Sequence, residues 1–248
     1  MDYSPYLGLG IAAVVLAGFF QGLTSFGFAL IAMPVLAKII PIQEAVPIVV
    51  ALSLITNVLI LKDGFRFVDL RKIWPLILAS FVAAPLGTYS LLLLNADILK
   101  LLTGILVVLF AAVLLAGLRF PIRRERFAFA VTGALSGFLN GSISLSGPPV
   151  ALFLSNQGVD RHVFRANITA YALLLNVVTL ISFAATGLMS KDVIKLSAWL
   201  LPGMLIGLFI GIKLIRNLDE ALFRKIALCL ISVSGIWTLA SALDRLVG

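Results

Sequence analysis

The chain has 248 residues, of which 61% are hydrophobic and only 12% are charged. A soluble domain carries roughly 25% charged residues, so this composition excludes a water-soluble fold and predicts an integral membrane protein. The net charge of +8 does not indicate a nucleic-acid partner, because Lys and Arg gather in short segments between apolar runs. One histidine and one cysteine provide no usual ligand set for a transition metal, so no metal and no other cofactor is expected.

Ten apolar runs predict an all-α polytopic protein that crosses the membrane several times. Five or six of the runs are long enough to span a hydrocarbon core of about 30 Å at 1.5 Å per residue. The four short runs form two pairs, and a stretch rich in glycine, serine and amide residues interrupts each pair. In chain order the runs are 7–22, 25–40, 45–61, 73–94, 98–118, 127–140, 148–157, 166–187, 196–215 and 222–243.

The two interruptions resemble each other in sequence. Residues 18–25 read GFFQGLTS and residues 137–144 read GFLNGSIS, at an offset of 119 positions. Asn57 and Asn176 match at the same offset, and matches further along the chain have an offset of 124. A constant spacing between polar residues is not typical of chance similarity among apolar helices, and internal repeats with broken helices are typical of secondary transporters.

The predicted fold is a single transmembrane domain built from two inverted structural repeats. The first repeat covers 1–118 and the second 126–248, and a basic cytoplasmic linker at 119–125 joins them. Each repeat is expected to begin with a broken helix-loop-helix hairpin, at about 14–23 and 137–148, followed by three transmembrane helices. This arrangement gives about eight membrane-embedded helices or hairpins in total.

The distribution of charge favours hairpins over single broken crossings. If each interrupted pair returns to the side it entered, 14 Lys and Arg residues share one side of the membrane and 5 lie on the other. If each pair is one broken helix that crosses once, the split is 11 to 8. The positive-inside rule prefers the larger difference. We therefore expect halves of opposite orientation, with both termini on the side away from the cytoplasm.

A broken helix at membrane depth indicates a polar ligand, because irregular backbone is tolerated there only beside protein or a cavity. No charged side chain lies inside the runs away from their ends, so neutral donors must meet this ligand. Run 25–40 begins after Thr24 and Ser25, which are good N-cap residues. Run 148–157 begins after Ser144, Ser146 and Gly147, with Pro148 suited to the first helical position. Two facing helix N-termini carry together about one positive charge, which suits a small oxyanion.

The candidate substrate-binding residues flank the two interruptions or lie at matching depth in the next helix. For each small residue, helix packing is the alternative role, and for the two asparagines an interhelical hydrogen bond is equally expected. His162 and Arg165 are interpreted as topology charges, with a gate role as the alternative. The candidates are Gln21, Gly22, Thr24, Ser25, Phe26, Gly27, Asn57, Asn140, Gly141, Ser142, Ser144, Gly147, Pro148 and Asn176.

Three stretches resemble the TauE/SafE family of sulfite exporters. They read GFFQGLTSFGFALIAMP, GALSGFLNGSISLSGPPVALFLSNQG and RANITAYALLLNVVTL, and the resemblance covers essentially the whole chain. It implies a multi-pass carrier of the bacterial cytoplasmic (inner) membrane that exports sulfite or a small organosulfur anion. The family pattern carries over to Gln21, Gly22, Ser25, Phe26, Gly27, Asn140, Gly141, Ser144, Gly147, Pro148 and Pro149.

The leading hypothesis is a secondary transporter in which one inverted half rocks against the other. An anion channel with the same site is the main alternative. An intramembrane serine enzyme, suggested faintly by ALSG at 134–137 and SLSG at 144–147, lacks a general base because the only histidine lies in a linker. A scaffold without transport does not require paired polar breaks. The expected partners are the anion and the lipid bilayer, and a homo-oligomer is left open.

Overall fold

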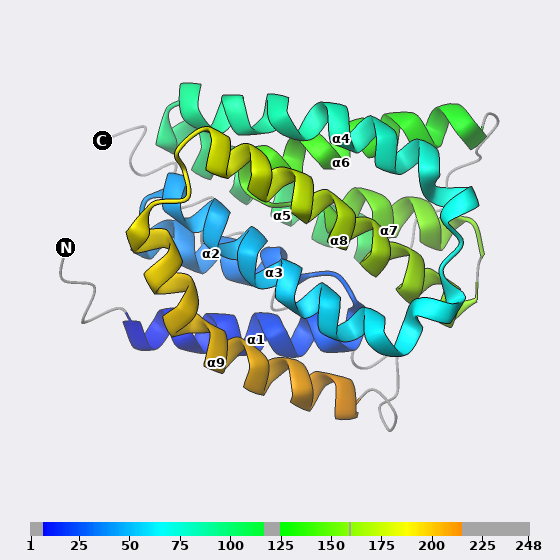
Figure 1. The fold of residues 1–248 in the computed structure, drawn as a ribbon, viewed down its shortest axis with the longest axis horizontal. Coiled ribbons are helices and arrows are strands. Elements are labelled where there is room, and N and C mark those ends of the chain that lie inside the picture. Colours follow the sequence, from blue (N-terminus) through cyan, green and yellow to red (C-terminus); the bar gives the residue numbers. More distant parts are fainter. Residues whose placement is uncertain (1–6, 117–124, 159, 215–248) are drawn as a thin grey trace.

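A computed structural model describes residues 7–116, 125–158 and 160–214. In these ranges the chain forms α-helices and one short 3-10 turn, without a β-strand (Figure 1). The elements are α1 (Leu7–Thr24), α2 (Phe28–Ile39), α3 (Ile42–Gly64), η1 (Phe65–Phe67), α4 (Leu70–Leu93), α5 (Ala96–Ala116), α6 (Glu125–Ile143), α7 (Gly147–Asn156), α8 (Arg161–Ala185) and α9 (Lys191–Leu214).

The predicted all-α class is confirmed for the described residues, and each of the first nine apolar runs corresponds to one helix. The tenth run, 222–243, lies outside them. Four helices are long and apolar enough to cross a membrane, namely α3, α4, α8 and α9. One boundary differs from the prediction. His162 and Arg165 lie in the first turns of α8 rather than in a linker, because the Asp160 carboxylate accepts a 2.8 Å hydrogen bond from the His162 backbone N–H and caps the helix.

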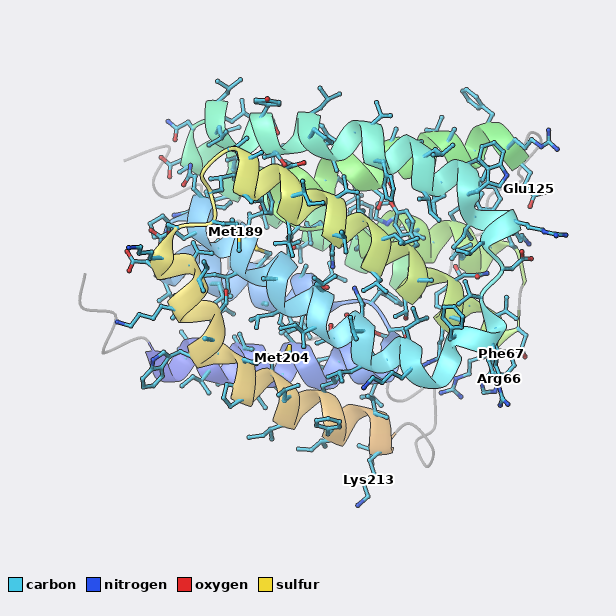
Figure 2. The ribbon with its side chains drawn as sticks, viewed as in Figure 1. Arg66, Phe67, Glu125, Met189, Met204 and Lys213 are labelled. Atoms are coloured by element: carbon cyan, nitrogen blue, oxygen red, sulfur yellow. The ribbon has the colours of Figure 1, made fainter. Side chains whose placement is uncertain are left out.

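The chain reverses direction at both interruptions, so that α2 runs back beside α1 and α7 runs back beside α6 (Figure 1). The connection from α3 to α4 and the starts of α6 and α8 lie at one end of the molecule. Figure 2 shows Arg66, Phe67 and Glu125 at this end and Met189 at the opposite one. We call the first end the basic end, since the segments 62–72, 125–126 and 161–165 that belong to it contain Lys62, Arg66, Arg71, Lys72, Arg126, Arg161 and Arg165.

The buried apolar side chains form two clusters that do not follow the order of the sequence. One cluster comes mainly from α1, α2, α3, α5 and α9, and we call these helices the first bundle. The other comes from α4, α6, α7 and α8, which we call the second bundle. Helices α4 and α9 therefore pack mainly with helices from the other half of the sequence.

Glycine contacts between backbones join α1 to α9 and α4 to α6. A Cβ atom at Gly22 would lie 2.6 Å from the carbonyl oxygen of Leu208, and one at Gly141 would overlap the carbonyl oxygen of Ala84. Such close approach of two helix backbones is typical of small residues in membrane proteins. These two helix pairs make the most extensive contacts in the described chain.

Candidate functional site

Each interruption is a left-handed turn at a serine. Ser25 has φ 67° and Ser144 has φ 62°, and they are the only non-glycine residues with positive φ in the described chain. The Ser25 N–H donates to the carbonyl of Gln21 over 2.8 Å, and the Ser144 N–H donates to that of Asn140 over 3.1 Å. A residue in the left-handed region commonly ends an α-helix, so α1 and α6 stop at positions that are related by the offset of 119.

The start of α2 differs from the prediction that Thr24 and Ser25 cap it. The N-cap residue is Gly27, at φ 107°, and its successor Phe28 donates its N–H to Oε1 of Gln21 over 3.1 Å. The Thr24 hydroxyl instead lies within hydrogen-bonding distance of the carbonyls of Phe20 and Phe26, to either of which it can donate. The side chain of Gln21 is long enough to bridge the break, so it replaces a cap from the adjacent residues.

The start of α7 also differs in detail from the prediction. Its N-cap is Ser146, without a side-chain cap, and Gly147 is the first helical residue, so Pro148 takes the second position rather than the first. Ser144 does not cap the helix. The carbonyl of Ser146 accepts a 2.7 Å hydrogen bond from the hydroxyl of Ser136, and this bond ties the second break to α6.

An amide of each break is bonded to an asparagine of the following long helix. Gln21 donates from Nε2 to Oδ1 of Asn57 over 2.9 Å, and Asn140 donates from Nδ2 to Oδ1 of Asn176 over 3.1 Å. Asn140 also donates to the hydroxyl of Thr179 over 2.8 Å. All five side chains are buried. The structure therefore gives each asparagine the interhelical hydrogen bond that was one of its two expected roles. It adds Thr179, which lies one turn beyond Asn176 on the same face of α8.

The two breaks lie against each other. A Cβ atom at Gly147, the first residue of α7, would lie 3.2 Å from Cβ of Phe26 and 3.9 Å from the backbone nitrogen of Gly27. Phe26 and Gly27 immediately precede α2. Phe26, Gly27 and Gly147 are each partly accessible, while most residues around them are buried. The starts of α2 and α7 thus meet at one place in the fold.

Three candidate residues are engaged in packing or in helix hydrogen bonds. Gly22 faces the backbone of α9, and Gly141 faces the backbone of α4. The hydroxyl of Ser142 donates to the carbonyl of Phe138 over 2.8 Å. These contacts assign the packing role to both glycines, because a side chain at either would push two helices apart.

Two donors at the first break have no hydrogen-bond partner. They are the hydroxyl of Ser25, in a residue with 1% of its surface exposed, and Nδ2 of Asn57, in a residue with 0% exposed. Burying an unpaired polar group costs about 1–3 kcal/mol. A ligand with acceptor oxygens would satisfy both donors.

One charged residue reaches the first break from the other half of the sequence. Arg165, in the second turn of α8, donates from Nη1 to the carbonyl of Leu23 over 2.5 Å and from Nη2 to that of Gly22 over 3.1 Å. Its neighbour Phe164 packs edge-on against Phe26, with ring centroids 6.3 Å apart. The interpretation of Arg165 as a topology charge missed this contact. The available signal was its position directly before the apolar run 166–187.

No group of three His, Cys, Asp or Glu residues in the described part of the chain is arranged to hold a metal ion. The groups present at the two breaks are neutral donors, helix N-termini and one nearby guanidinium. This combination suits an anion.

Comparison with known proteins gives one family. The family model described as sulfite exporter TauE/SafE matches residues 10–238. No curated protein and no solved structure matches the chain.

Proposed function

The chain belongs to the TauE/SafE sulfite exporter family, and from this premise we propose that it exports sulfite or a related small organosulfur anion by alternating access. The observation that carries the proposal is the meeting of the two breaks, where Gly147 at the start of α7 lies against Phe26 and Gly27 at the start of α2. Each helix N-terminus carries about half a positive charge. Two of them at one place form a site that favours an anion.

Neutral donors complete the proposed site. Ser25 and Asn57 supply the hydroxyl and amide N–H that have no protein partner. Gln21 and Asn140 hold Asn57 and Asn176 in place through their amide bonds. An oxyanion has several acceptor oxygens, so it can receive hydrogen bonds from more than one of these groups at once.

Packing supports the proposal of two inverted repeats, 1–118 and 126–248, with about eight membrane-embedded elements. The boundary at 119–125 lies mostly outside the described residues. Three close contacts between α1 and α9 have counterparts between α6 and α4, at offsets of 119 and 124 positions. The pairs are Gly18 with Met204 and Gly137 with Ser80, Gly22 with Leu208 and Gly141 with Ala84, Gly211 with Phe19 and Gly87 with Phe138.

The same packing favours moving units that differ from the two halves of the sequence. Rocking one half against the other would separate α1 from α9 and α4 from α6, whose backbones are in contact through glycines. We therefore propose that the first bundle moves against the second. Their main interface is the contact of α3 with α8, and Asn57 and Asn176 lie on these two helices.

Export as the direction of transport follows from the family, and the charge distribution gives the orientation. Under the positive-inside rule the basic end faces the cytoplasm, and the protein lies in the bacterial cytoplasmic membrane. An inside-negative potential favours anion exit by about 2.3 kcal/mol per charge per 100 mV. Export by a uniporter needs no carboxylate in the membrane for coupling.

Two other functions are less well supported. An anion channel would use the same site, but counterflow of labelled sulfite against its gradient occurs only in a carrier.

A serine enzyme needs a base beside its nucleophile. The hydroxyl of Ser136, a candidate nucleophile, donates to the Ser146 carbonyl. His162 stacks on Phe67 at the basic end, with ring centroids 5.2 Å apart. The histidine is thus engaged by Phe67 rather than by this serine.

Sulfite binding by the purified protein tests the proposal. Wild type is compared with the double variant Gln21→Ala/Asn140→Ala, with sulfate and thiosulfate as comparison anions. Thr103→Ala serves as control, because it removes a buried hydroxyl of α5 that bonds only within its own helix. We expect selective sulfite binding by wild type and control, and its loss in the folded double variant. A double variant that binds as tightly as wild type would show that the breaks serve packing alone.

A further inference from the structure

We propose that the anion site is polarised, with the anion bound at the first break and its charge balanced by Arg165. This inference rests on the proposed function and names the part of the site that holds the ligand. Repeat symmetry by itself predicts two equivalent half-sites. The contacts at the two breaks are not equivalent.

The unpartnered buried donors of the amide network lie at the first break. Ser25 and Asn57 are both joined to Gln21, whose Nε2 donates to Oδ1 of Asn57 over 2.9 Å and contacts the carbonyl of Ser25 at 3.5 Å. The Ser25 hydroxyl and Nδ2 of Asn57 are left without partners in the same neighbourhood. Two buried donors around one amide form a place where an acceptor is required.

Arg165 changes the electrostatics of this break. Where a helix breaks and restarts, the negative C-terminus of the first segment opposes the positive N-terminus of the second. The guanidinium of Arg165 bonds the last carbonyls of α1, at Gly22 and Leu23. A cation there offsets the negative end of α1, so the positive N-terminus of α2 dominates the potential that an anion meets.

The second break differs from the first in three respects. Its α7 begins Gly147-Pro148-Pro149, and proline has no N–H, so two of the first three helical residues cannot donate to a ligand. Asn140 gives its amide N–H groups to Asn176 and Thr179. At the offset of 119, the residue that corresponds to Arg165 is Val46, which is buried and uncharged. This break therefore acts as a wall of the site rather than as a second half-site.

Sulfite binding by paired variants tests the polarity. The double variant Ser25→Ala/Asn57→Ala is compared with Ser144→Ala/Asn176→Ala, the same chemical change at the offset of 119. We expect the dissociation constant to rise at least about tenfold for the first pair, which loses ligand contacts worth a factor of ten or more, and clearly less for the second. Thermal unfolding in detergent confirms that each variant is folded. Equal losses in the two pairs would overturn the polarity.

Arg165 is tested as a positioning residue by separating its charge from its shape. Arg165→Gln removes the charge, Arg165→Lys keeps it without the planar fork, and Lys213→Gln removes a charge from an exposed residue at the end of α9. We expect weaker sulfite binding in Arg165→Gln, and near wild-type binding in Arg165→Lys and Lys213→Gln. If Arg165 acted only through the planar shape of its guanidinium, sulfite binding would be weakened equally in the lysine and glutamine variants.

The result for wild type separates the two proposals. If wild type does not bind sulfite, the proposed function fails and the polarity fails with it. If wild type binds sulfite while Arg165→Gln binds equally well and the paired double variants lose equally, only the polarised site is wrong.

Discussion

Gln21 joins the first break to the third helix through a 2.9 Å hydrogen bond from its Nε2 to Oδ1 of Asn57. Its Oε1 accepts the N–H of Phe28, the first residue of α2. One side chain at the end of α1 is thus bonded both to the start of α2 and to the face of α3 that carries Asn57. Asn140 makes the corresponding bond to Asn176, but its shorter side chain is not hydrogen-bonded to the start of α7 in this way.

The Gln21–Asn57 pair is expected to be energetically coupled. Removing one partner leaves a buried polar group unsatisfied, which costs about 1–3 kcal/mol, whereas removing both costs less than the sum. Unfolding of Gln21→Leu, Asn57→Leu and the double variant in detergent measures this coupling. We expect a coupling energy of about 1 kcal/mol. Additive losses would mean that the two side chains do not stabilise each other.

A side chain at the α1–α9 contact is expected to destabilise the protein. A Cβ atom at Gly207 would overlap the carbonyl oxygen of Val15, so Gly207→Ala must separate the two helices at a cost of about 1–3 kcal/mol. Gly10→Ala is the matched control in α1, because its Cβ atom would make an ordinary 3.7 Å contact with Leu36. Thermal unfolding of both variants checks the expectation. Equal stability of Gly207→Ala and the control would contradict the packing.

Cross-links are expected to distinguish fixed contacts from the moving interface. Cβ atoms at Gly64 and Ala166, at the α3–α8 contact, would be 3.8 Å apart, a distance that suits a disulfide. In a Cys229→Ser background, oxidised Gly64→Cys/Ala166→Cys is expected to stop sulfite transport, and reduction is expected to restore it.

The control for this cross-link joins two helices of the same bundle. A Cβ atom at Gly203 would lie 3.3 Å from the side chain of Val15, so Val15→Cys/Gly203→Cys links α1 to α9. Oxidation of this pair is expected to leave transport intact. Transport that survives the α3–α8 link and fails with the α1–α9 link would reverse the assignment of the moving units.

Labelling with a membrane-impermeant thiol reagent tests the orientation. Single cysteines replace Arg66, Glu125 and Lys191 in the Cys229→Ser background. Arg66 and Glu125 lie at the basic end, and Lys191 follows Met189 at the opposite end (Figure 2). We expect whole cells to be labelled at Lys191→Cys only. Labelling of Lys191→Cys on the same side as Arg66→Cys and Glu125→Cys would refute the hairpin topology, because a single broken crossing at 127–157 places all three on one side.

The sequence by itself determined the class of the protein, the positions of the described helices and the two interruptions. Hydrophobic runs, Gly and Pro act locally, so nine of the ten runs correspond to described helices. The offset of 119 also singled out Asn57 and Asn176, and each of them accepts a hydrogen bond from the amide of a break.

Tertiary structure alone decided how those elements are used. Gln21 rather than Thr24 caps the start of α2, because a bond across seven residues depends on the fold of the break. Arg165 bonds Leu23, 142 positions away in the chain. Helices α4 and α9 each pack with helices from the other half of the sequence, because glycines on those helix faces allow two backbones to approach closely. Such contacts join segments that are distant in the chain, and the local patterns of a single sequence do not record which faces will meet.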